Sequence, residues 1–171
     1  MDTFCEQLIT LKKTTSDWFA ILGYFAASSL LSCAAIYFLI YFGVIPFALS
    51  FLFLFLAYKL STRHNIEFEY IVTNGIFDVD KITNRTSRKR LLSFTLSNVT
   101  TLEKFNINKL KNVDKKQILF ACDKNDANAY LMIIQKSGDQ PNYLIFSPDD
   151  KMKNSITSFL QRFACKIFCF R

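Results

Sequence analysis

Residues 18–58 read WFAILGYFAASSLLSCAAIYFLIYFGVIPFALSFLFLFLAY and contain no charged side chain. A single α-helix of about 41 residues would be about 60 Å long. The hydrocarbon core of a bilayer is about 30 Å thick, and a helix that spans it needs about 20 residues. The stretch is therefore about twice as long as one crossing requires, and Gly43 and Pro46 near its middle favour a turn. We predict a transmembrane helical hairpin over residues 18–60, with helices at about 18–40 and 44–60.

Two other interpretations fit this stretch less well. A buried helical hairpin of a soluble protein would rarely contain such a long run without charge. The segment Leu30-Leu31-Ser32-Cys33 loosely resembles a bacterial lipoprotein signal in which Cys33 would be lipidated. However, a lipoprotein has a polar tether after that cysteine, and here the chain stays apolar as far as Tyr58.

Basic residues on both sides of the hairpin predict its orientation. Lys12 and Lys13 precede it, and no basic residue lies in the turn. Because positively charged flanks stay in the cytoplasm, we expect a multi-pass protein of the inner (plasma) membrane with both termini cytoplasmic. Residues 1–17 would then be a cytoplasmic N-terminal segment. The residues expected at the membrane interface, where aromatic rings and basic side chains are favoured, are Trp18, Tyr58, Lys59 and Arg63.

After the hairpin the sequence changes to strict alternation. Residues 66–72 (IEFEYIV) place four apolar side chains on one face and both glutamates on the other, as in a half-buried strand. Asn74-Gly75 follows, which is the strongest short signal for a β-hairpin because a type I′ turn needs positive φ at both central residues. Residues 77–80 (FDVD) alternate again, so that the apolar faces of the two predicted strands match.

The register of this hairpin creates a charge problem. It sets Glu69 opposite Asp80, and like charges that face each other across two strands are unfavourable. A basic group is therefore expected beside them. The segment Arg88-Lys89-Arg90 opens the next predicted strand, at residues 89–94, and would supply this group if that strand pairs with the second one.

The rest of the chain is predicted to complete one α+β domain at residues 66–171. Ser147 can cap a helix at about 148–168, in which Pro148 suits the first position and apolar residues recur every three or four positions. Six or seven antiparallel strands would form a small curled sheet or β-barrel, with the C-terminal amphipathic helix on its open side. The remaining strands are expected at 98–104, 118–122, 130–135 and 143–146.

Several segments together resemble a known group of proteins. They are the helical hairpin, the strand at 66–72, Asn74-Gly75, residues 78–82 (DVDKI) and residues 88–93 (RKRLLS). In this combination the chain is similar to small uncharacterised membrane proteins of Firmicutes, whose soluble part looks like a bacterial pleckstrin-homology (PH)-like domain. The resemblance implies a membrane hairpin with a cytoplasmic PH-like domain, and it implies no enzyme activity and no binding residues.

The sequence offers few groups for catalysis or metal binding. His64 is the single histidine and lies in a polar connector, so a histidine cluster for a metal is not available. The four glycines are scattered, which argues against a glycine-rich phosphate loop. An odd number of cysteines, five, is typical of reduced thiols in the cytoplasm. We therefore expect a protein that is not an enzyme, with no metal and no cofactor.

Basic residues are concentrated after the hairpin. From Lys59 to Arg171 the chain has 19 Lys and Arg against 11 Asp and Glu, or about +8. Near the inner leaflet each suitably placed basic residue contributes about 1 kcal/mol of attraction to the membrane. Alternatively, the basic residues between Lys81 and Arg90 neutralise the carboxylates of the first two strands. The candidate contacts with lipid or a partner are Lys81, Arg85, Arg88, Lys89, Arg90, Lys109, Lys111, Lys115 and Lys116.

The type of lipid contact follows from the loop between the first two strands. PH domains that bind phosphoinositides usually have a basic loop there, and here the loop is the neutral segment 73–76 (TNGI). Attraction to anionic lipids in general is therefore expected, without recognition of one headgroup. Nucleic acid is not an expected partner, because these basic residues are not interleaved with aromatic residues on which bases could stack.

These observations predict a non-enzymatic, membrane-anchored PH-like module that acts as an interaction or scaffold domain at the cytoplasmic leaflet. Its partners would be the lipid bilayer, anionic lipids, and a second copy or another membrane protein. The alternative is an accessory subunit of a larger membrane complex, packed through its hairpin. Small residues such as Gly23, Ala27 and Ala34 would then allow close contact between helices.

Overall fold

The computed structural model divides the chain into two compact units. One comprises residues 1–11, 67–82 and 88–171, and the other comprises residues 12–66 and 83–87. The structure describes residues 4–38, 41, 43–110, 113–123, 126–135 and 140–168, with the side chains of 108, 109 and 162–168 left out. Each unit is described by itself below.

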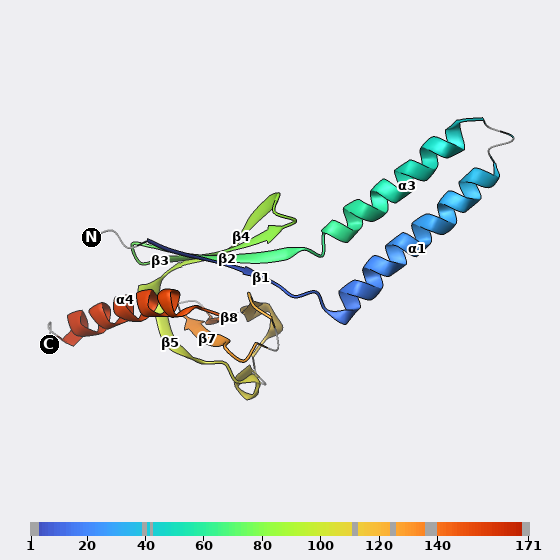
Figure 1. The fold of residues 1–171 in the computed structure, drawn as a ribbon. Helices are drawn as coiled ribbons and strands as arrows, with labels where there is room; N and C mark the ends of the chain where they lie inside the picture. The colour runs from blue at the N-terminus through green and yellow to red at the C-terminus, as the bar shows by residue number, and fades with distance from the viewer. Residues whose placement is uncertain are drawn as a thin grey trace. The chain divides into compact units, whose positions relative to one another are not determined.

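The second unit is built on two antiparallel helices, α1 (Thr15–Tyr37) and α3 (Ile45–Thr62) (Figure 1). Both are long and apolar enough to span a membrane. Thr14 caps α1 in a capping box with Asp17, whose carboxylate accepts a hydrogen bond of 2.9 Å from the Thr14 backbone N–H. The predicted helices are present, although α1 begins three residues before the predicted start at 18 and both helix ends shift by a few residues.

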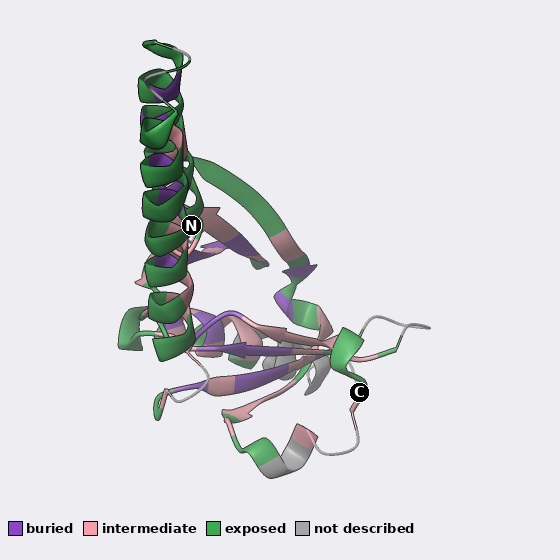
Figure 2. Ribbon diagram, turned by 90° about the vertical axis from the view of Figure 1, so that its right-hand side faces the viewer, coloured by how far each residue is buried: buried purple, intermediate pink, exposed green. Residues whose placement is uncertain are grey.

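The residues buried between α1 and α3 are mostly small, with Ile21 and Pro46 as the exceptions. Ser32 Oγ donates to Ser50 O, and Ser50 Oγ donates to Ser32 O, both at 3.4 Å. Ser28 and Ala57 are also buried, whereas most of the large phenylalanine and leucine residues of the two helices are exposed (Figure 2). Small residues let two helix backbones approach closely, which is how helices pack in lipid.

The first sheet contains a strand that the sequence analysis did not predict. Strands β1 (Phe4–Thr10), β2 (Ile66–Thr73), β3 (Ile76–Thr83) and β4 (Ser87–Thr95) lie in that order. β1 is antiparallel to β2, with Phe4 opposite Thr73 and Thr10 opposite Glu67. The helical hairpin is therefore an insertion between two paired strands, and the predicted separation of residues 1–17 from the later domain does not hold for residues 1–11.

The turn between β2 and β3 has the predicted conformation. Asn74 has φ of 49° and Gly75 has φ of 85°, as a type I′ turn requires. A second constraint acts on Gly75, because a Cβ atom at this position would collide with the ring of Phe159. Glycine is thus needed both for the backbone conformation and for the approach of the C-terminal helix.

The second sheet has the order β5-β7-β8-β6. Its strands are β5 (Val99–Lys104), β6 (Ile118–Phe120), β7 (Tyr130–Ile134) and β8 (Asn142–Phe146). β8 lies between β6 and β7, so that β6 and β8 both run opposite to β7 and are parallel to each other. The prediction of antiparallel strands is therefore wrong for this pair, and the two sheets do not close into a barrel. Short 3-10 helices lie at Leu96–Asn98, Ile107–Leu110 and Lys115–Gln117.

The core lies between the two sheets and is centred on aromatic rings. The ring of Tyr70 on β2 is 6.2 Å from that of Phe77 on β3 and 5.6 Å from that of Phe146 on β8. All three residues are fully buried. The Tyr70 hydroxyl donates a hydrogen bond of 2.6 Å to Ala121 O, which satisfies this polar group inside the core. Burial raises the pKa of Tyr70, so it remains a neutral donor.

The C-terminal helix α4 (Asp150–Phe168) covers this core. Met152 and Ile156 are fully buried. Ser147 was the predicted cap, but Asp149 caps the helix instead, since its Oδ1 accepts a hydrogen bond of 2.7 Å from Met152 N. Gln7 of β1 binds the start of this helix, because it donates to Ser147 O at 3.0 Å and accepts from Asp149 N at 2.9 Å.

Candidate functional site

The outer face of the first sheet carries a concentration of charged side chains. Alternation along the strands places the core residues on one face and the charged residues on the other. Across this outer face lie five carboxylates and two guanidinium groups: Glu6, Glu67, Glu69, Asp78, Asp80, Arg88 and Arg90. We call these seven residues the charged face.

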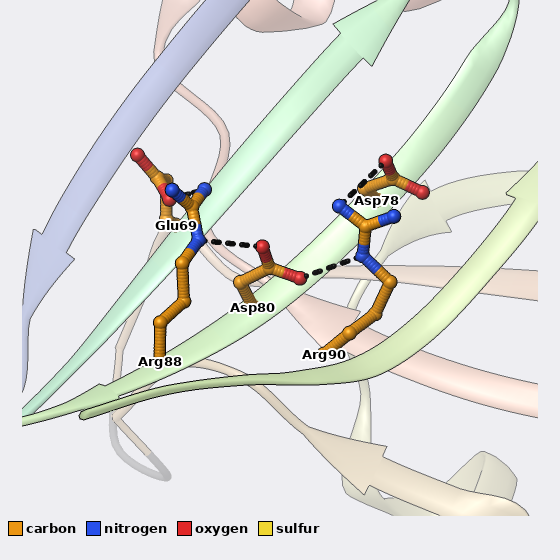
Figure 3. Close-up of polar contacts among 5 residues, drawn as sticks. All are labelled: Glu69, Asp78, Asp80, Arg88 and Arg90. Carbon is orange, nitrogen blue, oxygen red and sulfur yellow. Dashed lines mark hydrogen bonds and ion pairs between the residues drawn. The ribbon is translucent and has the colours of Figure 1, made fainter.

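Two arginines of β4 bind three of the carboxylates (Figure 3). Arg88 Nε donates to Asp80 Oδ2 at 2.7 Å, and its Nη2 forms an ion pair with Glu69. Arg90 Nε donates to Asp80 Oδ1 at 3.0 Å, and its Nη2 lies 3.2 Å from Asp78 Oδ2. The predicted neutralisation of Glu69 and Asp80 by residues 88–90 is therefore confirmed for Arg88 and Arg90.

Asp80 is the centre of this network. It is only 2% exposed, and each of its oxygens is bound by a different arginine. Burial alone would raise the pKa of Asp80, but the hydrogen bonds from Arg90 and Arg88 outweigh it, so its pKa is lowered. Asp80 is thus a buried, ionised carboxylate held by two charge-assisted pairs.

The pKa of Glu69 is shifted in the opposite direction, upward. Burial raises its pKa first, and a hydrogen bond with Glu6 raises it further against the attraction of Arg88. Glu6 lies on β1 beside Glu69, because its neighbour Leu8 is the residue that pairs with Glu69. Glu6 was missed by the sequence analysis, since nothing in the local sequence shows which later strand residues 4–10 join.

The other basic residues predicted to contact lipid or a partner lie on several different elements. Lys81 lies on β3, Arg85 lies in the β3–β4 turn with φ of 56°, and Lys89 is exposed on β4 between the two bound arginines. Lys115 and Lys116 are exposed in the short helix after β5. Lys111 and the side chain of Lys109 lie outside the described residues. The role of these basic residues in binding stays a prediction.

The residues predicted for the membrane interface lie at the two ends of the hairpin that join the strands. Trp18 is exposed in the first turn of α1, and the ammonium of Lys13 lies 5.2 Å from its ring centre. Tyr58 and Arg63 are exposed near the end of α3. Lys59 Nζ lies 5.8 Å from the ring centre of Phe55. A basic group over an aromatic ring at each helix end is typical of side chains at a membrane interface.

His64 joins the same two helix ends. Its Nδ1 lies 2.9 Å from Asp17 Oδ1, and its ring lies 5.9 Å from that of Tyr24. In the described part of the chain, no group of three or more His, Cys, Asp or Glu side chains is placed to hold a metal ion. The chemistry left for His64 is its contact with Asp17, which links the first turn of α1 to the segment that follows α3.

Comparison with known proteins gives one result. No curated protein and no solved structure matches the chain. The model of the family described as bacterial PH-like domain (DUF6106) matches residues 1–166. This match includes β1 and most of α4 as well as the helical hairpin, and it confirms the resemblance to bacterial PH-like domains. The chain therefore belongs to the bacterial PH-like domain family.

Proposed function

We propose that this protein is a non-enzymatic, membrane-anchored interaction module. Its hairpin would cross the inner membrane twice, and its PH-like domain would act as a scaffold at the cytoplasmic leaflet. A PH-like domain supports binding to other molecules in general, and the hairpin supplies the anchor. Two observations on the hairpin support this proposal.

The main observation is the distribution of side chains on α1 and α3. A helical hairpin in water buries its large apolar residues and exposes its polar ones. Here the buried residues include Ser28, Ser32 and Ser50, and the exposed ones include many phenylalanines and leucines. This arrangement is stable where the solvent is itself apolar, as it is in the bilayer core.

The second observation is the pairing of β1 with β2. Because Thr10 and Glu67 lie opposite each other in one sheet, the two ends of the hairpin must be on the same side of any membrane. An even number of crossings satisfies this condition, and a single crossing does not. The basic flanks Lys12, Lys13, Lys59 and Arg63 favour the cytoplasm as that side.

Protease protection tests this topology. In intact spheroplasts, an epitope tag inserted after Gly43 is expected to be cleaved by external protease, while a tag at the C-terminus is cleaved only after lysis. A tag at the N-terminus is the control for the paired strands, because it must behave like the C-terminal tag. Recovery of the protein in the soluble fraction, or a C-terminal tag that is cleaved from outside, would show that the proposal is wrong.

The lipid part of the proposal concerns the basic residues that are not bound within the charged face. Lys81, Lys89, Lys115 and Lys116 would be attracted to anionic headgroups by about 1 kcal/mol each. In nanodiscs, energy transfer between a dye on the domain and labelled lipid is expected to be higher with phosphatidylglycerol than with phosphatidylcholine, and to fall with salt. Changing these four lysines to glutamine should remove the difference; equal transfer on both lipids from the start contradicts lipid contact.

An accessory role in a larger membrane complex is the second candidate. The exposed small residues Gly23, Ala26, Ala27 and Ala34 on α1 favour it, because they leave space for a further helix. Purification in mild detergent separates the two functions. A second membrane protein recovered in constant ratio supports the accessory subunit, and self-contacts alone support the module.

A further inference from the structure

The first sheet ends in two strands with open edges. β1 and β4 are the outermost strands of the order β1-β2-β3-β4. Within the described residues, the backbones of Phe4–Thr10 and Ser87–Thr95 form no backbone hydrogen bond outside their own sheet. An open edge presents a row of N–H and C=O groups that can pair with a further strand. Both edges are seven or more residues long.

The two edges differ in charge and in apolar surface. On β4, Arg88, Lys89 and Arg90 are all exposed. The two arginines already bind carboxylates of their own sheet, but three successive basic side chains still disfavour the pairing of two β4 edges. On β1, Phe4 is 64% exposed and Leu8 is 54% exposed, with the exposed Glu6 between them. β1 therefore has an acidic, apolar edge without the lysines that usually protect an edge, and β4 has a basic one.

The directions of the strands allow these two edges to pair. Neighbouring strands of the sheet alternate in direction, so β4 of a second copy placed beside β1 runs antiparallel to it and continues the same sheet. One register matches the side chains of the outer face. It sets Glu6 opposite Arg90 and Phe4 opposite Leu92 of the second copy, whereas a shift by two residues sets Phe4 opposite Arg90.

We propose that β1 of one copy pairs with β4 of a second copy in this register. The proposal deepens the interaction function above and rests on it in one respect: anchoring confines all copies to one plane in one orientation, which raises their effective concentration. The contact joins two different edges of the molecule, so each copy keeps one free edge of each kind, and assembly continues or closes into a ring. A two-fold pairing of β1 with β1 is disfavoured, because it sets Glu6 opposite Glu6 or opposite an apolar residue, Phe4 or Leu8, of the other copy.

Cysteine crosslinking in membranes tests the register. Two tagged forms, Phe4→Cys and Leu92→Cys, are co-expressed in a background in which the five native cysteines are changed to alanine. Side chains directly opposite across two strands have Cβ atoms about 5 Å apart, which permits a disulfide. Within one copy these positions lie on opposite edges, about 14 Å apart across three strand spacings, so a crosslink must join two copies.

The expected product is a dimer that carries both tags, with little dimer from either form alone. A chain with both cysteines should give a ladder of higher species. Absence of the mixed dimer from correctly inserted protein would overturn the proposal. A mixed dimer of equal yield between Phe4→Cys and Leu8→Cys forms would replace it with two-fold pairing of β1, because Phe4 lies opposite Leu8 when Glu6 lies opposite Glu6. Membrane fractionation of the same cells reads the proposed function separately, because loss of anchoring moves the protein to the soluble fraction whether or not it crosslinks.

A charge variant in the native-cysteine protein provides a second measurement. Glu6→Lys sets a positive charge opposite Arg90 of the second copy, and the share of oligomer in mild detergent should fall about tenfold (about 1.4 kcal/mol). The variant is expected to fold, because within one copy a lysine at position 6 lies beside Glu69. Asp114→Lys, the same change of charge at an exposed residue before the short helix of Lys115–Gln117, is the control and should leave the oligomer unchanged. An equal effect of both variants would contradict the proposed edge.

Discussion

A chain in which the two residues Asn-Gly replace residues 11–66 is expected to fold as a water-soluble PH-like domain. Thr10 and Glu67 lie directly opposite each other, so a two-residue turn can join them as an ordinary β-hairpin. The replacement removes both helices and leaves every strand of the two sheets paired as before. The expected result is a monomer or small oligomer in the supernatant, with one cooperative thermal transition followed by circular dichroism.

The matched comparison is the fragment 66–171, which starts directly at β2 and lacks β1. This fragment loses the antiparallel partner of β2, the buried side chain of Cys5, and the contacts of Gln7 with Ser147 and Asp149. We expect it to aggregate or to unfold without a cooperative transition, because β2 becomes a long unprotected edge. Equal stability of the two proteins would show that β1 is not part of the folded domain.

Replacement of Arg88 by leucine is expected to cause the largest loss of stability among single changes on the charged face. It leaves Asp80 Oδ2 and Glu69 without the guanidinium that binds them, while both carboxyl groups remain buried. A buried carboxylate without its partner is strongly destabilising, and because Arg88 itself is half exposed we expect a loss of about 2–3 kcal/mol at pH 7. Urea unfolding of the full-length protein in detergent, followed by circular dichroism, measures this change.

The effect of Arg88→Leu should depend on pH in a defined direction. In the native protein the pKa of Asp80 is lowered, so its ionised form stabilises the fold above the ordinary pKa of an aspartate, and this contribution is lost as pH falls through the lowered value. The pKa of Glu69 is raised, so ionisation of this group opposes folding as pH rises through the raised value. The difference in free energy of unfolding between the variant and the native protein should therefore be largest near neutral pH. It should shrink in acid, where neutral carboxyl groups need no counter-ion.

Two controls separate charge from packing in this experiment. Lys89→Leu changes the adjacent exposed residue by the same substitution and should have little effect. Adding Asp80→Asn to Arg88→Leu should recover part of the loss, because it removes the buried charge that lacks a partner. A loss from Arg88→Leu that is independent of pH and unaffected by Asp80→Asn would contradict the role assigned to the ion pairs.

Local patterns in the sequence were sufficient for much of this structure. Alternation in residues 66–72 and 77–80 predicts the core face, and Tyr70, Val72, Phe77 and Val79 are indeed fully buried. It does not predict that Glu67, Glu69 and Asp80 on the other face are buried as well. The pair Asn74-Gly75 predicts the turn, because a type I′ turn needs positive φ at both central residues and this pair tolerates it. The ion pairs of Arg88 and Arg90 follow from the same register, since two opposed carboxylates inside a sheet need a counter-ion.

The features that were missed depend on contacts between distant parts of the chain. β1 pairs with a strand beyond the whole hairpin, and its seven residues carry no local sign of that partner. The parallel contact of β6 with β8 arises from the order of strands in the sheet, which alternation along a single strand does not specify. Pro148 suits a first helical position and therefore predicts a cap at Ser147, whereas Gln7 of β1 binds Ser147 and Asp149, and Asp149 is the cap.

The insertion of the hairpin between β1 and β2 affects how the protein is made. The ribosome releases β1 first, and its partner β2 emerges only after both helices have been synthesised. If the hairpin crosses the membrane twice as proposed, the sheet can be completed only after the second helix has brought the nascent chain back to the side where β1 lies. A copy with only one inserted helix would then have β1 and β2 on opposite sides of the bilayer, and its first sheet could not form.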